Sequence, residues 1–122
     1  MKIVVDAFGG DYAPQEIVAG AVKALQENEK LKVVLVGDKD KITDILQGLV
    51  FVSDRLEIVH APDVVTMEDV PTVAIRTKKT SSIVVAYDYL KQNEDAVALV
   101  SAGSTGATLT GAVLKLGRIQ NI

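Results

Sequence analysis

Residues 2–14 read KIVVDAFGGDYAP, and this stretch decides the fold class. Lys2 to Val5 is a short run rich in Val and Ile, which is typical of a β-strand. Two adjacent glycines, Gly9 and Gly10, then allow the backbone to turn sharply. Residues 14–28 repeat apolar side chains every four positions behind a proline suited to a first helical turn, which predicts an amphipathic helix. The stretch therefore predicts a strand, a tight turn and a helix.

The same alternation recurs along the rest of the chain. Three further apolar runs are nearly continuous rather than alternating, as expected of strands that helices cover on both faces. These strands are predicted at Leu31 to Val36, Leu56 to Val59 and Ala96 to Val100. Helices are predicted from Asp38 to Gly48, after Ser81-Ser82 and after Ser104-Thr105. The sequence thus predicts an α/β fold, a doubly wound and mainly parallel sheet of about four strands with helices on both faces.

Residues 62–80 interrupt this regularity. At nineteen residues the segment is too long for a plain connection between a strand and a helix. Pro71 is placed to open a brief helix that carries Ala74 and Ile75. We therefore expect a mobile or functional excursion here.

The composition limits the classes of function. The chain has 122 residues, 48% of them apolar and 24% charged, which predicts one compact soluble domain. The net charge of -3 argues against a nucleic-acid binder, and the absence of cysteine excludes disulfides and Cys-based zinc sites. Neither a metal nor a cofactor is predicted, since the one histidine has no second ligand nearby. The first apolar run is too short for a signal peptide or a membrane span, so a cytoplasmic protein is expected.

The loop after the first strand is a candidate site, because open α/β sheets bind ligands beyond the carboxyl ends of their strands. It contains Asp6, Gly9, Gly10 and Asp11. The glycines let the backbone approach a ligand closely. Asp6 ends a buried strand, so its charge must find a partner or a ligand. The alternative is a purely structural turn in which Asp11 caps the following helix.

The loop after the last predicted strand is a second candidate. Small residues and hydroxyls lead directly into a helix, so free backbone amides and the positive end of the helix dipole face the ligand position. A phosphate or an oxyanion would fit at Ser101, Gly103, Ser104, Thr105 and Gly106. The pattern is neither a Walker loop nor a GxGxxG fingerprint. A well-capped helix start without a ligand is the alternative.

Further candidates lie between these loops. Arg76 and Lys79 precede Ser81 and Ser82, so cations and a helix start come together within a few residues and would attract phosphate. A solvated basic loop is the alternative. His60 follows the third strand and is either a general base or donor, or a hydrogen-bonded structural residue.

Three ordered blocks resemble the PlsX family of phosphate acyltransferases. They are IVVDAFGGDYAP at 3–14, MEDVP at 67–71 with the basic and hydroxyl residues up to Ser82, and VSAGSTGA at 100–107 with KLGRI at 115–119. The resemblance spans essentially the whole chain. Phe8, Tyr12 and Ser104 stand where the family usually has Met, His and Asn, so no role of that His or Asn side chain is carried over.

The resemblance implies transfer of a fatty acyl group from acyl carrier protein to inorganic phosphate, which forms acyl phosphate for phospholipid synthesis. It implies that this chain is the amino-terminal part of a longer, two-lobed enzyme that forms homodimers. Members of the PlsX family have a fold similar to that of phosphotransacetylases and of isocitrate and isopropylmalate dehydrogenases, and the resemblance implies such a fold here. A place beside the membrane is also implied, where a membrane acyltransferase would use the product. The isolated chain is expected to carry only part of the active cleft.

In such a reaction phosphate itself attacks the thioester, so the protein needs only cations and N–H groups to position it and to stabilise the oxyanion. Phosphate would be positioned by Arg76, Lys79, Ser81 and Ser82. Phosphate or oxyanion contacts are expected from Gly9, Gly10, Ser101, Gly103, Ser104, Thr105 and Gly106. Asp6 and Asp11 would orient these groups, and His60 is a candidate donor or base. Two alternatives stay open: an acyltransferase of phosphotransacetylase type that uses acyl coenzyme A, and a non-catalytic anion- or nucleotide-binding module.

Overall fold

The sheet is parallel throughout. The computed structural model describes residues 1–49 and 53–117. Within them the strands are β1 (Lys2–Asp6), β2 (Lys32–Gly37), β3 (Leu56–His60) and β4 (Ala96–Val100), in the order β3-β2-β1-β4. Every predicted strand is present, with its ends moved by at most one residue. The predicted parallel α/β sheet is confirmed.

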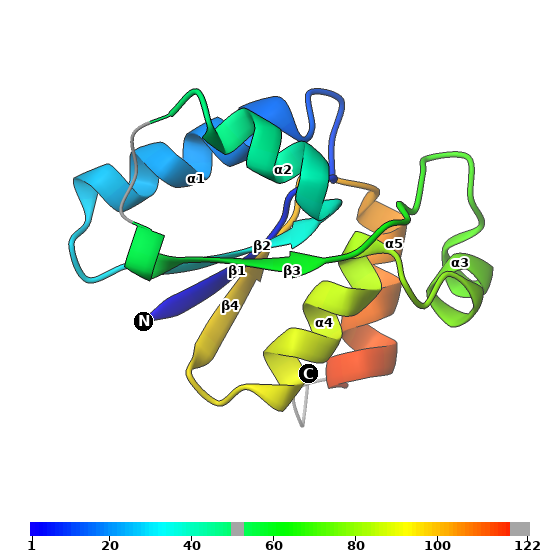
Figure 1. Cartoon of the computed structure of the whole chain (residues 1–122). Coiled ribbons are helices and arrows are strands. Elements are labelled where there is room, and N and C mark those ends of the chain that lie inside the picture. Colours follow the sequence, from blue (N-terminus) through cyan, green and yellow to red (C-terminus); the bar gives the residue numbers. More distant parts are fainter. Residues whose placement is uncertain (50–52, 118–122) are drawn as a thin grey trace.

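Helices cover both faces of this sheet. They are α1 (Gln15–Glu27), α2 (Lys39–Leu46), α3 (Pro71–Thr77), α4 (Ser82–Gln92) and α5 (Thr105–Gly111), with a 3-10 turn η1 (Ser53–Arg55) before β3 and a π-helical turn η2 (Ala112–Leu116) after α5. In Figure 1, α1 and α2 lie above the sheet and α4 and α5 below it, as expected of a doubly wound layer. Within the part of the chain that the structure describes, no helix is both long and apolar enough to span a bilayer.

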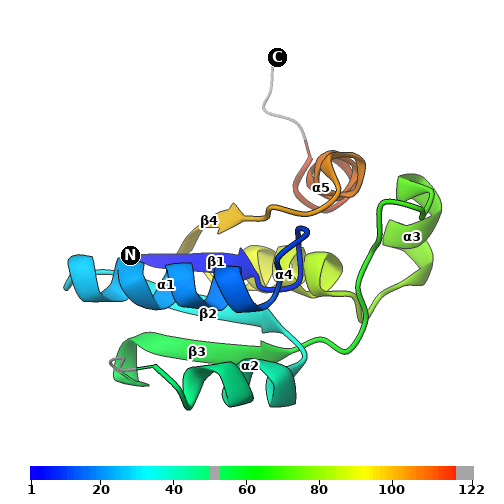
Figure 2. The ribbon, with the colours of Figure 1, turned by 90° about the horizontal axis from the view of Figure 1, so that it is seen from above.

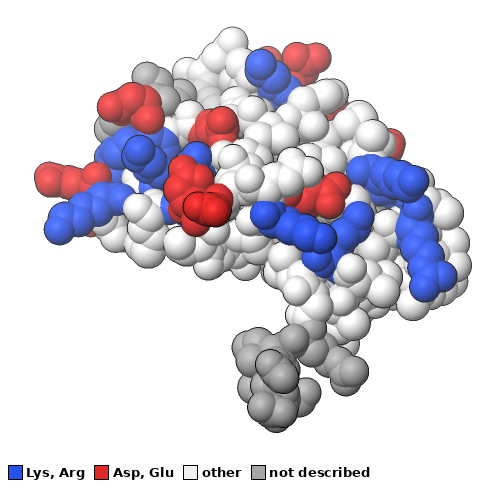
Figure 3. Space-filling view, turned by 90° about the horizontal axis from the view of Figure 1, so that it is seen from below, with Lys and Arg blue, Asp and Glu red and all other residues white. Residues whose placement is uncertain are grey.

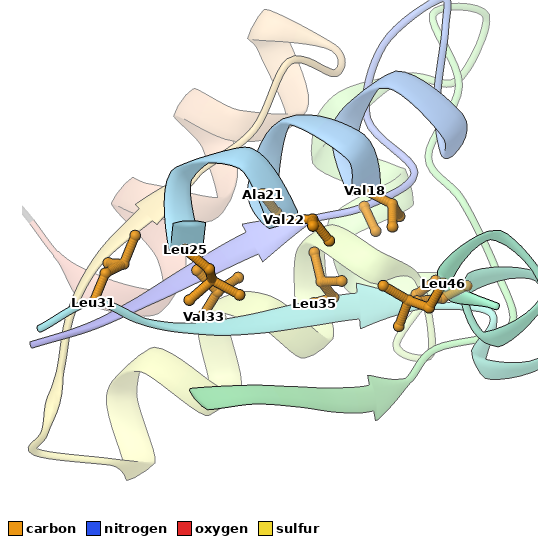
Figure 4. Packing of buried hydrophobic residues seen from close by; sticks show 10 residues of the cluster. Val18, Ala21, Val22, Leu25, Leu31, Val33, Leu35 and Leu46 are labelled. Carbon is orange, nitrogen blue, oxygen red and sulfur yellow. The ribbon is translucent and has the colours of Figure 1, made fainter. Parts of the chain in front are cut away.

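Strand β2 separates two apolar clusters and is itself buried from Val33 to Gly37. Val18, Val22 and Leu25 of α1 point toward the sheet and belong to the upper cluster, together with Val33 and Leu35 (Figure 4). Successive strand residues point to opposite faces, so the residues between them, Val34 and Val36, pack in the lower cluster with Val4 and with Ala86 of α4. Burial on both faces explains the continuous apolar run of β2. It does not explain that of β4, where Val97 and Val100 are exposed, so the prediction that helices cover both faces is wrong for this edge strand.

The strand order brings the two glycine- and hydroxyl-rich loops together. From β1 the chain continues through β2 to β3 on one side, whereas β4 pairs with β1 on the other side. The loops after β1 and β4 therefore leave neighbouring strands toward opposite faces of the sheet (Figure 1). Such a switch point is where open α/β sheets bind ligands. The loop that begins at His60 follows β3, two strands away from β1.

Residues 62–80 form an excursion whose two ends are joined. The Asp63 N–H donates to the Thr80 carbonyl at 3.2 Å, and the Ser82 N–H donates to the Asp63 carbonyl at 2.9 Å. Helix α3 stands apart from the sheet layer within this excursion (Figure 2). The predicted brief helix from Pro71 is confirmed, and its Ala74 and Ile75 are buried.

A charged brace crosses the excursion. The Lys78 ammonium contacts the Asp69 carboxylate at 2.7 Å and also donates to the Val64 carbonyl at 3.2 Å. The hydrogen bond from Lys78 holds the pKa of Asp69 below its ordinary value. The brace fixes residues 64–69 relative to α3, and this part of the excursion forms one wall of the site described below.

Candidate active site

Two adjoining pockets lie at the switch point. The inner pocket has a volume of about 10 Å³, room for a single water-sized group, and its polar lining comes from Asp6, Gly9, Ser82, Ser101, Gly103, Ser104 and Thr108. The outer pocket has a volume of about 360 Å³ and is lined by Phe8, Gly10, Asp11, Val64, Val65, Thr66, Met67, Ala102, Gly103 and Ser104. Both linings include Val65, Gly103 and Ser104, so the small pocket continues the large one inward.

Asp6 ties the two loops together. Its carboxylate is buried, with 4% of the residue exposed, and Oδ1 accepts a hydrogen bond from the Phe8 N–H at 3.1 Å. Oδ2 accepts from the Ser101 hydroxyl at 3.0 Å, and the Ser101 Oγ accepts from the Gly103 N–H at 3.2 Å. The partners predicted for this charge are thus hydrogen-bond donors, and the ion pairs found among the described residues do not include Asp6. Asp6 is thus hydrogen-bonded both to its own loop and to the loop after β4.

The glycine pair lets the loop after β1 lie directly on the loop after β4. A methyl group added at Gly9 would stand 2.7 Å from the Gly103 nitrogen and 2.8 Å from the Ser101 Oγ, closer than real side chains approach. Gly10 has φ +107°, a conformation that L side chains rarely adopt. The two glycines therefore allow close contact between the loops.

The start of α5 faces this contact. Ser104 is the N-cap, and its Oγ accepts a hydrogen bond from the Ala107 N–H at 3.2 Å. The backbone amides of Thr105 and Gly106 donate to no residue that the structure describes, as is general for a first helical turn. The predicted capped helix start is confirmed, and Ser104 also lines both pockets.

Replacing Ser104 by alanine is expected to lower the free energy of unfolding by about 1 kcal/mol, because the Ala107 N–H loses its acceptor. Ser104→Asn is the matched control, since asparagine caps helices as well as serine does. Urea denaturation followed by circular dichroism measures both variants. Equal stability of the alanine variant and the wild type would show that the cap contributes nothing.

Ser81 and Ser82 are both buried, but only one of them lines the site. Their exposed fractions are 0% and 1%, and neither hydroxyl oxygen has a hydrogen-bond partner among the described residues. Ser82 lines the inner pocket, whereas Ser81 lines neither pocket. Ser81, at the N-cap of α4, makes no side-chain cap. The structure therefore brings only Ser82 to the two loops.

Arg76 and Lys79 do not reach the switch point. They line a separate groove of about 310 Å³ together with Ile75, Leu114 and Lys115. Leu114 and Lys115 belong to η2, at the far end of the helical segment that begins with α5. Figure 3 shows basic side chains on the side of the molecule where α3 lies. Elsewhere on this face, acidic side chains stand among the basic ones. Cations and glycine loops are thus separate in this structure.

Four other predicted site residues have different surroundings. Asp11 is exposed at the outer pocket and does not cap α1, which has no side-chain cap, so the capping alternative is wrong. Thr105 lines a groove beside Leu109, and Gly106 packs against Pro71 at the start of α3. His60 accepts a hydrogen bond from the Lys39 N–H at 3.1 Å through Nδ1, at the start of α2. This contact supports the alternative in which His60 is a hydrogen-bonded structural residue rather than a general base or donor.

The sequence did not reveal several walls of the site. Val64, Val65 and Met67 come from the excursion, and Phe8 from the loop after β1. Tyr87 of α4 lies behind the inner pocket, where its hydroxyl donates to the Thr108 carbonyl at 2.6 Å. Burial raises the pKa of Tyr87, and the negative charge of Asp6 adds to the shift. Phe8 and Met67 lie within two of the three sequence blocks, but neither was predicted to line a site.

The pockets combine hydrogen-bonding groups with apolar walls. Hydroxyls and amides of the β4 loop face the inner end, and aliphatic and aromatic side chains form much of the outer end. No Lys or Arg of the described residues lines either pocket. Nor do three His, Cys, Asp or Glu side chains gather, anywhere in residues 1–49 and 53–117, in a way that would hold a metal ion. The arrangement suits a small polar group attached to, or beside, an apolar chain.

Comparison with known proteins agrees with the three sequence blocks. A family profile described as fatty acid synthesis protein matches residues 1–122. The phosphate acyltransferase of Pelotomaculum thermopropionicum is 50% identical over 122 residues, all of this chain and 35% of that protein. Those of Syntrophomonas wolfei and Acetivibrio thermocellus are 48% and 45% identical, again over the whole chain but over only 38% and 36% of their own length.

The chain therefore spans little more than a third of the length of these curated relatives. The resemblance stated from the three blocks is confirmed, because the profile matches from the first residue to the last. This chain belongs to the fatty acid synthesis protein family, and over its whole length it is similar to proteins named phosphate acyltransferase.

Proposed function

We propose that this chain forms one side of the active site of an enzyme that transfers a fatty acyl group from acyl carrier protein to inorganic phosphate. The observation that supports it most is the meeting of the β1 and β4 loops in one pair of pockets at the switch point. The names of the relatives support the same reaction class. Homodimerisation and a place beside the membrane stay predictions from the resemblance.

In this proposal phosphate lies at the inner end of the site and the acyl thioester enters from the outer pocket. The hydroxyls of Ser82 and Ser104, which both line the inner pocket, donate hydrogen bonds to the oxygens that carry negative charge during the attack. Phe8, Val65 and Met67 offer an apolar surface to the first carbons of the acyl chain. Transfer then depends on position rather than on a protein nucleophile.

A phosphate dianion also requires cations, and the described linings contain none. Arg76 and Lys79, which were predicted from the sequence to position phosphate, line another groove. We therefore assign the cations to a part of the full-length relatives outside the matched segment, which is nearly two thirds of their length. This assignment agrees with a cleft between two lobes.

A chimera tests the proposal. Residues 1–122 would replace the matched segment of the P. thermopropionicum enzyme, which is 50% identical. We expect the purified chimera to form acyl phosphate from acyl carrier protein thioester and phosphate, with the parent enzyme as control. A folded chimera that forms no acyl phosphate while the parent does would contradict the proposal. Activity with acyl coenzyme A alone would support the phosphotransacetylase-type alternative instead.

A further inference from the structure

Two residues that line the inner pocket, Ser82 and Asp6, have unused hydrogen-bonding capacity. The Ser82 hydroxyl is 1% exposed and has no partner among the described residues. A buried hydroxyl without a partner destabilises a protein, so such a group calls for an explanation. Asp6 accepts one hydrogen bond at each oxygen, whereas a carboxylate offers about four acceptor positions. A donor without an acceptor and an acceptor with spare capacity thus line the same space.

A hydroxyl group satisfies both capacities at once. It accepts a hydrogen bond from Ser82 and donates its own proton to Asp6. The inner pocket holds one oxygen-sized group, and it continues into the outer pocket past Gly103 and Ser104. An oxygen in the inner pocket can therefore belong to a larger ligand whose other atoms lie outward.

We propose that the inner pocket recognises the P–OH group of inorganic phosphate, with Ser82 as donor to that oxygen and Asp6 as acceptor of its proton. The proposal rests on the proposed function, which makes phosphate a substrate. No bond is formed or broken in this step, and the proton stays on the ligand. Ser82 and Asp6 are binding groups in this scheme, and Asp6 keeps its role in positioning the loops.

The same geometry selects phosphate over sulfate. Near neutral pH both main forms of inorganic phosphate keep at least one P–OH, whereas sulfate has no proton. A sulfate oxygen in the inner pocket would meet the Asp6 carboxylate with no hydrogen between them, and two like charges at contact distance repel strongly. Discrimination between these two anions of similar shape is therefore the specific mark of the proposal.

The test is phosphate binding followed by ³¹P NMR at constant ionic strength, with sulfate added as a competitor. It is made on the 122-residue chain, and on the chimera through the KM for phosphate. For the wild type we expect binding that an equal concentration of sulfate does not displace. Ser82→Ala should weaken phosphate binding about tenfold or more, because a hydrogen bond to a charged ligand is lost.

Ser81→Ala is the matched control. It removes an equally buried, unpartnered hydroxyl from the neighbouring position, and that hydroxyl lines neither pocket. It should bind phosphate as the wild type does. Asp6→Asn should bind phosphate more weakly and let sulfate compete, since its amide donates where the carboxylate accepted. Circular dichroism shows whether each variant is folded. If Asp6→Asn does not fold, the comparison of Ser82→Ala with Ser81→Ala tests the inference.

Three results would overturn the inference. They are equal phosphate binding by Ser82→Ala and Ser81→Ala, sulfate competition with the wild type as strong as that of phosphate itself, and absence of phosphate binding to both the chain and the chimera. Failure of the proposed function has a different signature, because phosphate would then bind with the expected pattern although the chimera formed no acyl phosphate. Conversely, an active chimera whose KM for phosphate is insensitive to Ser82→Ala would overturn the inference and leave the proposed function standing.

Discussion

A Gly9→Ala variant is expected to lose phosphate binding and acyl transfer by about a hundredfold, the scale of loss that a displacement of about 1 Å causes at a reacting centre. The added methyl group would stand 2.7 Å from the Gly103 nitrogen, 2.8 Å from the Ser101 Oγ and 2.9 Å from an Asp6 oxygen. The first of these atoms belongs to the backbone, and the two side-chain oxygens are hydrogen-bonded to each other at 3.0 Å. The loop after β4 must therefore move away from the loop after β1.

Gly20→Ala is the matched control for this variant. Gly20 lies within α1, is exposed, and has no other atom within 4 Å of the position that a methyl group would take. The exchange should stabilise the helix by about 1 kcal/mol without touching the site. Calorimetry of phosphate binding and the chimera assay measure both variants. If Gly9→Ala bound phosphate and turned over like Gly20→Ala, the close contact of the two loops would not be needed for function.

The second large effect is expected for stability, at the opposite end of the sheet. The Arg55 guanidinium donates to three carbonyl oxygens, those of Leu25 at 2.9 Å, Asn28 at 2.8 Å and Leu31 at 3.0 Å. It thereby satisfies carbonyls at the carboxyl end of α1 and places a positive charge at the negative end of the helix dipole. We expect Arg55→Ala to lower the free energy of unfolding by about 2 to 3 kcal/mol.

Arg55→Lys separates geometry from charge in this experiment. Lysine keeps the charge but lacks the planar fork, so we expect it to recover only part of the loss. Lys23→Ala removes a cation from the exposed face of α1 and should leave stability nearly unchanged. Urea unfolding gives the free energies. Phosphate binding of folded Arg55→Ala should equal that of the wild type, and a loss of binding without a loss of stability would contradict this structural role.

The site also shows why a buried acid stands in a place proposed for an anion. Asp6 has both oxygens engaged by groups of the two loops, so its charge is compensated by hydrogen bonds. The acid therefore holds the loops in register and, in the inference drawn above, accepts the proton of the ligand. An aliphatic residue at this position would leave the Phe8 N–H and the Ser101 hydroxyl without their acceptor.

The sequence by itself determined the elements and their order. The strand predicted from Ala96 to Val100 has those bounds in the structure, and Asp38 caps α2 as expected by accepting from the Asp40 and Lys41 amides. Such features depend on side-chain periodicity and on groups within a few residues of one another. Local interactions were enough to predict them.

Only the tertiary structure decided which loops meet. Arg76, Lys79 and Ser82 are close in sequence, yet the length of α3 and its packing turn the two cations to a groove shared with Lys115. His60 ends a strand as Asp6 does, but β3 lies at the edge of the sheet and the histidine binds the start of α2. Ser81 and Ser82 are chemically identical neighbours, yet only Ser82 lines the inner pocket. Strand order and helix packing arise from contacts between distant segments, so no local pattern carries this information.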